Sequence, residues 1–115
     1  MLRKPLTLNR EIVEAIIARE EEYFRNRTPR SHHIHEHAKS LLPMGVSSSF
    51  QAVPPYPLFI SHAQGSHIWD YDGNEYADFH LGFGSLLVGH VHPVLVEAFR
   101  DQLGKGILYS LPCPD

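Results

Sequence analysis

This 115-residue sequence has a single cysteine, no long apolar run and no dominant charge. Its single cysteine, Cys113, cannot form an internal disulfide, which excludes a small secreted fold held together by disulfides. No apolar run approaches the roughly 18–20 residues that span a membrane, and the basic N-terminal residues are not followed by the apolar core of a signal peptide. The net charge is −3, which argues against a nucleic-acid surface. We therefore expect a cytoplasmic protein that binds neither membranes nor nucleic acids.

Motifs for nucleotide binding and for local catalysis are missing too. The glycines Gly82, Gly84 and Gly89 are not followed by the Gly-Lys-Ser/Thr of a P-loop, and they lack the spacing of a dinucleotide fingerprint. No local set of serine, histidine and aspartate is present, and Cys113 has no companion that would activate it as a nucleophile. The residues alone therefore indicate tight backbone turns in the glycine-rich stretch and no catalytic residue.

Histidine is plentiful, with nine in the chain and four of them between residues 32 and 37. On a helix His33 and His37 are neighbours at i and i+4 and could share a metal ion. A structural site needs about four ligands, so a solvated polar helix face is favoured, and a histidine-rich metal-binding or interaction module stays as the alternative function. For His90 and His92, a hydrogen-bonding loop residue and a helix cap are favoured over a base or ligand pair.

Two helices are expected at the N-terminal end. Apolar residues recur with helical spacing from Asn9 to about Phe24, and Asn9 or Thr7 could cap the start of this helix. The pattern is expected to stop at Pro29, because the residue before a proline is pushed out of helical geometry. A second short helix, capped by Ser31, is expected to run through Leu42.

A loop, a small sheet and a further helix are expected after that. Residues 43–57 have neither helical nor strand periodicity and indicate an ordered loop. Residues 58–79 contain short alternating runs, and Asp-Gly at 72–73 is a strong hairpin signal. Pro93 and Gly104 have the residue types of a helix start and of the position just past a helix end. The expected fold class is α+β, with three short strands and three helices whose apolar faces suggest a piece of a larger fold.

Four blocks of the sequence, taken in order, resemble the N-terminal quarter of the class III aminotransferases, which use pyridoxal phosphate. The likeness runs over about residues 35–114 and is greatest to the glutamate-1-semialdehyde 2,1-aminomutase group. The blocks are residues 43–49, residues 57–60 with 65–79, residues 84–93, and Leu111-Pro112.

The resemblance implies a part of a fold-type I enzyme that is an obligate homodimer and transfers an amino group on an amino acid or amino-aldehyde substrate. It divides residues 1–115 into a helical arm (1–42), a substrate-mouth loop (43–57), a β-hairpin region (58–79), and a glycine-rich loop with a helix and a truncated tail (80–115).

The resemblance also implies substrate-binding roles for Ser48, Gln51 and Phe83. The position of Gln51 is an arginine in the aminomutase pattern, where it pairs with the substrate carboxylate, and the position of Phe83 is a tryptophan. Glutamine cannot form the bidentate charged pair, and phenylalanine lacks the indole N–H. An ordinary transaminase is therefore as consistent with the sequence as a mutase.

The cofactor-binding residues of the family, including the Schiff-base lysine, correspond to positions beyond residue 115. Lys4, Lys39 and Lys105 match none of them. We expect that this chain alone neither holds pyridoxal phosphate nor transaminates. A non-catalytic partner that docks onto a full-length paralogue is a further alternative.

Overall fold

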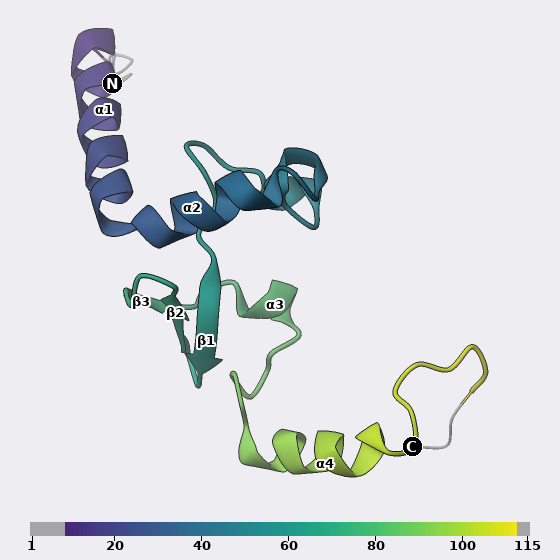
Figure 1. The fold of residues 1–115 in the computed structure, drawn as a ribbon. Helices are drawn as coiled ribbons and strands as arrows, with labels where there is room; N and C mark the ends of the chain where they lie inside the picture. The colour runs from purple at the N-terminus through teal and green to yellow at the C-terminus, as the bar shows by residue number, and fades with distance from the viewer. Residues whose placement is uncertain (1–8, 113–115) are drawn as a thin grey trace, which may run out of the picture. The chain divides into compact units, whose positions relative to one another are not determined.

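The fold of residues 9–112 is described by a computed structural model, so Lys4 and Cys113 lie outside the described residues. Helices and a three-stranded sheet are both present, which confirms the α+β class (Figure 1). Two compact units are formed, one by the residues up to Ile60 with Asp70–Asn74 and the other by Ser61–Trp69 with the residues from Glu75 onward. The elements are α1 (Arg10–Arg27), α2 (Pro29–Ala38), the 3-10 turns η1 (Pro43–Gly45) and η2 (Ser49–Gln51), β1 (Ile60–Gln64), β2 (His67–Asp70), β3 (Glu75–Ala77), α3 (Leu81–Gly84) and α4 (Pro93–Leu103).

Helix α1 starts where the sequence predicts. The Asn9 side chain accepts hydrogen bonds from the backbone N–H groups of Glu11 and Ile12, at 3.0 and 3.5 Å. The expected end near Phe24 is three residues too early, because polar residues continue the helix to Arg27 after the apolar pattern has stopped.

Helix α2 differs from the prediction at both ends. The first helix does stop before Pro29, because Thr28 has non-helical backbone angles, but Pro29 itself begins α2, where its missing N–H leaves no group unpaired. Ser31 is not the cap. It lies in the first turn, completely buried, and its hydroxyl accepts a hydrogen bond from the Phe59 N–H at 3.1 Å. The helix ends at Ala38 instead of Leu42.

The buried centre of the first unit is built around one tyrosine. Tyr56 is 2% exposed, and its ring lies 5.0 Å from that of Phe24 and is stacked at 4.7 Å on that of His32. Its hydroxyl lies 3.0 Å from the Thr28 hydroxyl, which also donates to the Phe24 carbonyl at 2.7 Å. Val46 is the other buried large apolar side chain among the described residues. This core is small, and polar contacts contribute much of its order.

The predicted hairpin turn is present between β2 and β3. These strands are antiparallel, with Ile68 opposite Tyr76, in a sheet of order β1-β2-β3. The Asp70 side chain is 1% exposed and accepts hydrogen bonds from the backbone N–H groups of Asp72 and Asn74, at 3.0 and 2.8 Å. Strand β1 begins at Ile60 instead of residue 58.

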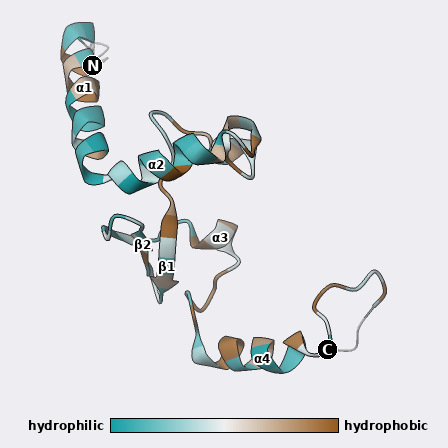
Figure 2. Ribbon diagram, in the orientation of Figure 1, coloured by the Kyte–Doolittle hydropathy of each residue, from teal (hydrophilic) through white to brown (hydrophobic). Residues whose placement is uncertain are grey.

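Helix α4 runs from Pro93 to Leu103 and is followed by Gly104, as predicted. Hydrophobic residues recur along it (Figure 2), and side chains such as Phe99 are exposed. The same is true of Ile16 and Ile17 on α1. Within residues 9–112, no helix is long and apolar enough to cross a bilayer.

The Tyr56 hydroxyl gives a direct test of this core. Replacing Tyr56 by phenylalanine removes the bond to Thr28 and is expected to lower the free energy of unfolding by about 1–2 kcal/mol. Denaturant unfolding of the chain measures this. Tyr23→Phe is the matched control, because that ring is 57% exposed, and it should change stability by less than about 0.5 kcal/mol. Equal effects of the two changes would contradict this view of the core.

Candidate functional site

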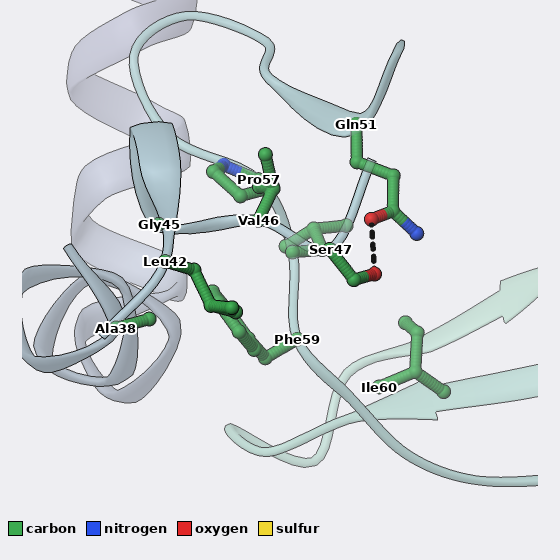
Figure 3. Close-up of a pocket in the computed structure, with 10 residues that line it drawn as sticks. Ala38, Leu42, Gly45, Val46, Ser47, Gln51, Pro57, Phe59 and Ile60 are labelled. Atoms are coloured by element: carbon green, nitrogen blue, oxygen red, sulfur yellow. Dashed lines mark hydrogen bonds between the residues drawn. The ribbon is translucent and has the colours of Figure 1, made fainter. Parts of the chain in front are cut away.

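The loop after α2 encloses a cleft of about 380 Å³ in the first unit (Figure 3). Its walls are mostly apolar, and Ser47 and Gln51 supply its polar side chains. The lining residues are Ala38, Leu42, Gly45, Val46, Ser47, Gln51, Pro57, Leu58, Phe59 and Ile60. The size and lining are typical of a site that accepts a small molecule or a side chain.

The start of this loop is fixed against α2 by His35. The ring Nε2 of His35 hydrogen-bonds to the Met44 carbonyl at 3.0 Å. Met44 and Gly45 both have left-handed backbone angles, with φ of 58° and 69°. A Cβ on Gly45 would lie 2.7 Å from the His35 ring, so only glycine allows this close approach.

Ser48 and Gln51 lie together in and beside the η2 turn, which carries Gln51 at the edge of the cleft. The Gln51 side-chain oxygen accepts hydrogen bonds from the Ser47 hydroxyl at 2.9 Å and from the Ser48 N–H at 3.2 Å. The side-chain nitrogen of Gln51 points away from Ser47 (Figure 3). Gln51 therefore has its amide hydrogens, and no charge, to offer to a ligand.

Phe83, the third candidate substrate residue, belongs to the second unit and is described apart from Ser48 and Gln51. It lies in the short helix α3 with a positive φ of 59° and is 73% exposed. Its ring meets that of His80 edge-on, with the centroids 4.1 Å apart. The structure therefore brings together two of the three predicted residues.

Asp78 ties together both ends of the glycine-rich loop. One carboxylate oxygen accepts from the N–H groups of His80 and Leu81 at 2.8 and 3.0 Å, and the other lies 2.7 Å from Nε2 of His90. The bond with His90, followed by the bonds with these backbone groups, lowers the pKa of Asp78 below its usual value. The prediction that His90 is a hydrogen-bonding loop residue is confirmed. The role of Asp78 was missed, because its partners are as many as twelve residues away.

Gly89 allows this loop to close. Gly65 and His90 exchange two backbone hydrogen bonds of 2.9 and 2.8 Å, and a Cβ on Gly89 would lie 2.7 Å from the Gly65 carbonyl oxygen. Gly89 also has a φ of +79°. His92 occupies the cap position of α4 as predicted, although its side chain makes no capping bond.

The histidine cluster on α2 is divided among separate contacts. His32 stacks on Tyr56, and His35 bonds to the Met44 carbonyl. His33 and His37 are exposed. No group of three or more side chains placed to hold a metal ion occurs within residues 9–112.

The described residues do not fit a pyridoxal phosphate site, which needs a lysine amine beside donors for a phosphate. Lys39 forms a 2.7 Å ion pair with Glu36 on the exposed face of α2 and lowers the pKa of that carboxyl. Lys105 follows α4 and is exposed. Neither lysine lines the cleft that carries Gln51.

Comparison with known proteins defines the class of this fold, because its structural neighbours are fold-type I pyridoxal phosphate enzymes. Glutamate-1-semialdehyde-aminomutase from Pseudomonas aeruginosa superimposes with a TM-score of 0.81 at 30% identity, over 94% of this chain and 24% of that one. β-Phenylalanine aminotransferase from Variovorax paradoxus gives a TM-score of 0.79 at 27% identity, over 88% of this chain and 24% of that one.

The sequence matches lead to the same family. Residues 49–114 match the model of the class-III aminotransferases. Glutamate-1-semialdehyde 2,1-aminomutase from Methanosarcina acetivorans is 48% identical over 83 residues, which are 72% of this chain and 20% of that protein. The chain belongs to the class III aminotransferase family, and it spans about a fifth of the length of this curated relative.

Gly89→Ala tests the closure of the glycine-rich loop. The new Cβ would meet the Gly65 carbonyl oxygen in an unfavourable backbone conformation, so we expect a loss of about 2 kcal/mol or more in the free energy of unfolding. Gly104→Ala is the control, because Gly104 has a φ of −72° and open space around it. Urea unfolding distinguishes them, and a tolerated Gly89→Ala would contradict the close approach.

Asp78→Asn tests the pH dependence of the same loop. Because the pKa of Asp78 is lowered by folding, the ionised carboxylate stabilises the loop above the usual aspartate pKa of about 4. This contribution is expected to disappear as the pH falls below that value toward the lowered pKa of the folded state. The stability difference between the native chain and Asp78→Asn should therefore shrink in acid. A difference that is equal in acid and at neutral pH would contradict the assignment, and Asp101→Asn on α4 controls for general effects of acid.

Proposed function

We propose that this chain forms the N-terminal segment of a pyridoxal phosphate-dependent aminotransferase or aminomutase. The complete enzyme would transfer an amino group on an amino acid or amino-aldehyde substrate, as a homodimer in the cytoplasm. The observation that carries this proposal is the superposition of 94% of the chain on the Pseudomonas aeruginosa aminomutase. That aminomutase has also been solved in complex with PMP, which supports pyridoxal phosphate as the cofactor of the complete enzyme.

The segment 43–57 would form the mouth of the substrate site, with the helical arm 1–42 supporting it. Ser48 and Gln51 would contact the substrate from this loop. Phe83 would contribute an aromatic wall from the glycine-rich region. The joint position of Ser48 and Gln51 at the edge of an apolar cleft supports their part in the proposal.

The identity of residue 51 would set the preferred substrate. The Gln51 oxygen is engaged by Ser47 and Ser48, so the side chain would offer neutral N–H groups alone. A neutral amide binds a carboxylate more weakly than a guanidinium does. The proposed substrate therefore either lacks a carboxylate at this place or binds it without a full counter-charge.

The chemistry itself would come from outside the described segment. Lys39 is engaged with Glu36, and neither Lys39 nor Lys105 lines the cleft. The segment would accordingly bind and orient substrate, and it would not transaminate by itself.

A chimera tests this function. The chain replaces the corresponding segment of the Methanosarcina acetivorans aminomutase, and aminotransfer is measured with a carboxylate-bearing substrate. In the chimera, Gln51→Arg is expected to lower the KM about ten- to a hundredfold with kcat little changed, because the arginine would bind ground state and transition state alike.

Gln64→Arg is the matched control, since it adds the same charge on the exposed strand β1 and should leave KM unchanged. A chimera that folds and binds cofactor but transfers no amino group would contradict the proposed function. An equal response to both arginine variants would contradict the role of Gln51 alone.

A further inference from the structure

We infer that Asp72, in the turn between β2 and β3, is a positioning residue for the loop 43–57. It acts by capping helix α2 from a distant part of the sequence. The functional consequence for substrate binding rests on the proposed function, whereas the structural coupling does not.

The start of α2 has no cap of its own. Thr28 occupies the cap position but makes no capping bond, since its hydroxyl donates to the Phe24 carbonyl. The Asp72 carboxylate supplies the missing acceptors. Its two oxygens accept from the N–H groups of Arg30 and Ser31 at 2.9 and 3.1 Å, and a carboxylate is favoured at this end of a helix.

The same turn also holds the end of α1. The Asn74 side-chain nitrogen donates to the Arg27 carbonyl at 2.9 Å, and its oxygen accepts from the Arg27 guanidinium at 3.2 and 2.8 Å. Asp70 bonds to that side-chain nitrogen at 2.9 Å. One five-residue turn, Asp70–Asn74, therefore fixes both helix ends at the α1–α2 junction.

The capped turn of α2 is connected directly to the end of the loop. Ser31, whose N–H is held by Asp72, accepts a hydrogen bond from the Phe59 N–H. The Phe59 carbonyl accepts from the N–H of Tyr71, the neighbour of Asp72, at 3.0 Å. Phe59 is thus held on both sides by groups that the turn positions, and it lines the cleft (Figure 3).

The other anchors of the loop lie on α2 and at the junction between α1 and α2. His35 on α2 holds the Met44 carbonyl at the start of the loop, and Thr28 holds the Tyr56 hydroxyl near its end. A shift of the first turn of α2 would therefore move both attachments of the segment that carries Ser48. Asp72 therefore positions that segment from a distant part of the sequence, through the first turn of α2.

Amide hydrogen exchange, measured in residues 1–115, tests the coupling. Asp72→Ala should speed exchange about tenfold at Arg30 and Ser31, the lost cap, and also at Phe59 and Ser48, which Asp72 does not touch. Asp72→Asn keeps one acceptor oxygen and should restore most of the protection. Asp101→Ala on α4 is the matched control and should leave these four amides unchanged.

Faster exchange confined to Arg30 and Ser31 would overturn the positioning role, because Asp72 would then act only as a cap of α2. If Asp72→Ala does not fold, Asp72→Asn is used in its place. The inference would then be overturned by faster exchange at Arg30 or Ser31 with unchanged exchange at Phe59 and Ser48.

Kinetics in the chimera separate this inference from the proposed function. Asp72→Ala should raise KM several-fold with kcat retained, and Asp72→Asn should rescue it. A chimera without aminotransfer in which the coupled exchange persists would refute the function and support the positioning. The positioning role alone would be refuted by an active chimera in which Asp72→Ala leaves KM unchanged, if the exchange rates of the Phe59 and Ser48 amides are also unchanged.

Discussion

The first unit depends on the hydrogen bonds between the Asp72 carboxylate and the backbone N–H groups in the first turn of α2. Helix α2 begins with a proline, and the Thr28 hydroxyl is used in the core, so the first free N–H groups of the helix need an acceptor from elsewhere. Asp72 meets that need from more than forty residues further along the chain. The hydrogen bonds of Ser31 and Asn74 then extend the constraint to Phe59 and to the end of α1.

Polar contacts contribute much of the order of this unit because the apolar core of the described chain is small. Tyr56 and Val46 are buried, whereas many large side chains of α1 and α4 face solvent. A segment with few buried apolar residues obtains order from buried hydrogen bonds, whose partners cannot be removed without leaving an unpaired group. The chain spans 20% of the length of the Methanosarcina relative that it matches.

Local features of the fold were predictable from sequence, and long-range ones were not. The Asn9 cap, the turn at Asp72-Gly73 and the boundaries of α4 follow from residue types over a few positions. The sequence predicts Ser31 as the cap of α2, because a serine before a helical pattern is typical of a cap. The actual cap, Asp72, could not be predicted, since nothing local connects residue 72 to this helix. Asp78 was missed for the same reason. Ser48 and Gln51 were predicted as substrate residues from family resemblance, and the hydrogen bond between them comes from the structure.

The turn at Asp70–Asn74 positions the loop that would receive the substrate. The most direct test is a through-hydrogen-bond scalar coupling, measured by NMR in the intact chain, between the amide nitrogens of Arg30 and Ser31 and the carboxyl carbon of Asp72. Both couplings are expected. Their absence, in a spectrum where the His32 amide still shows its coupling to the Thr28 carbonyl, would contradict the remote cap and the organisation built on it.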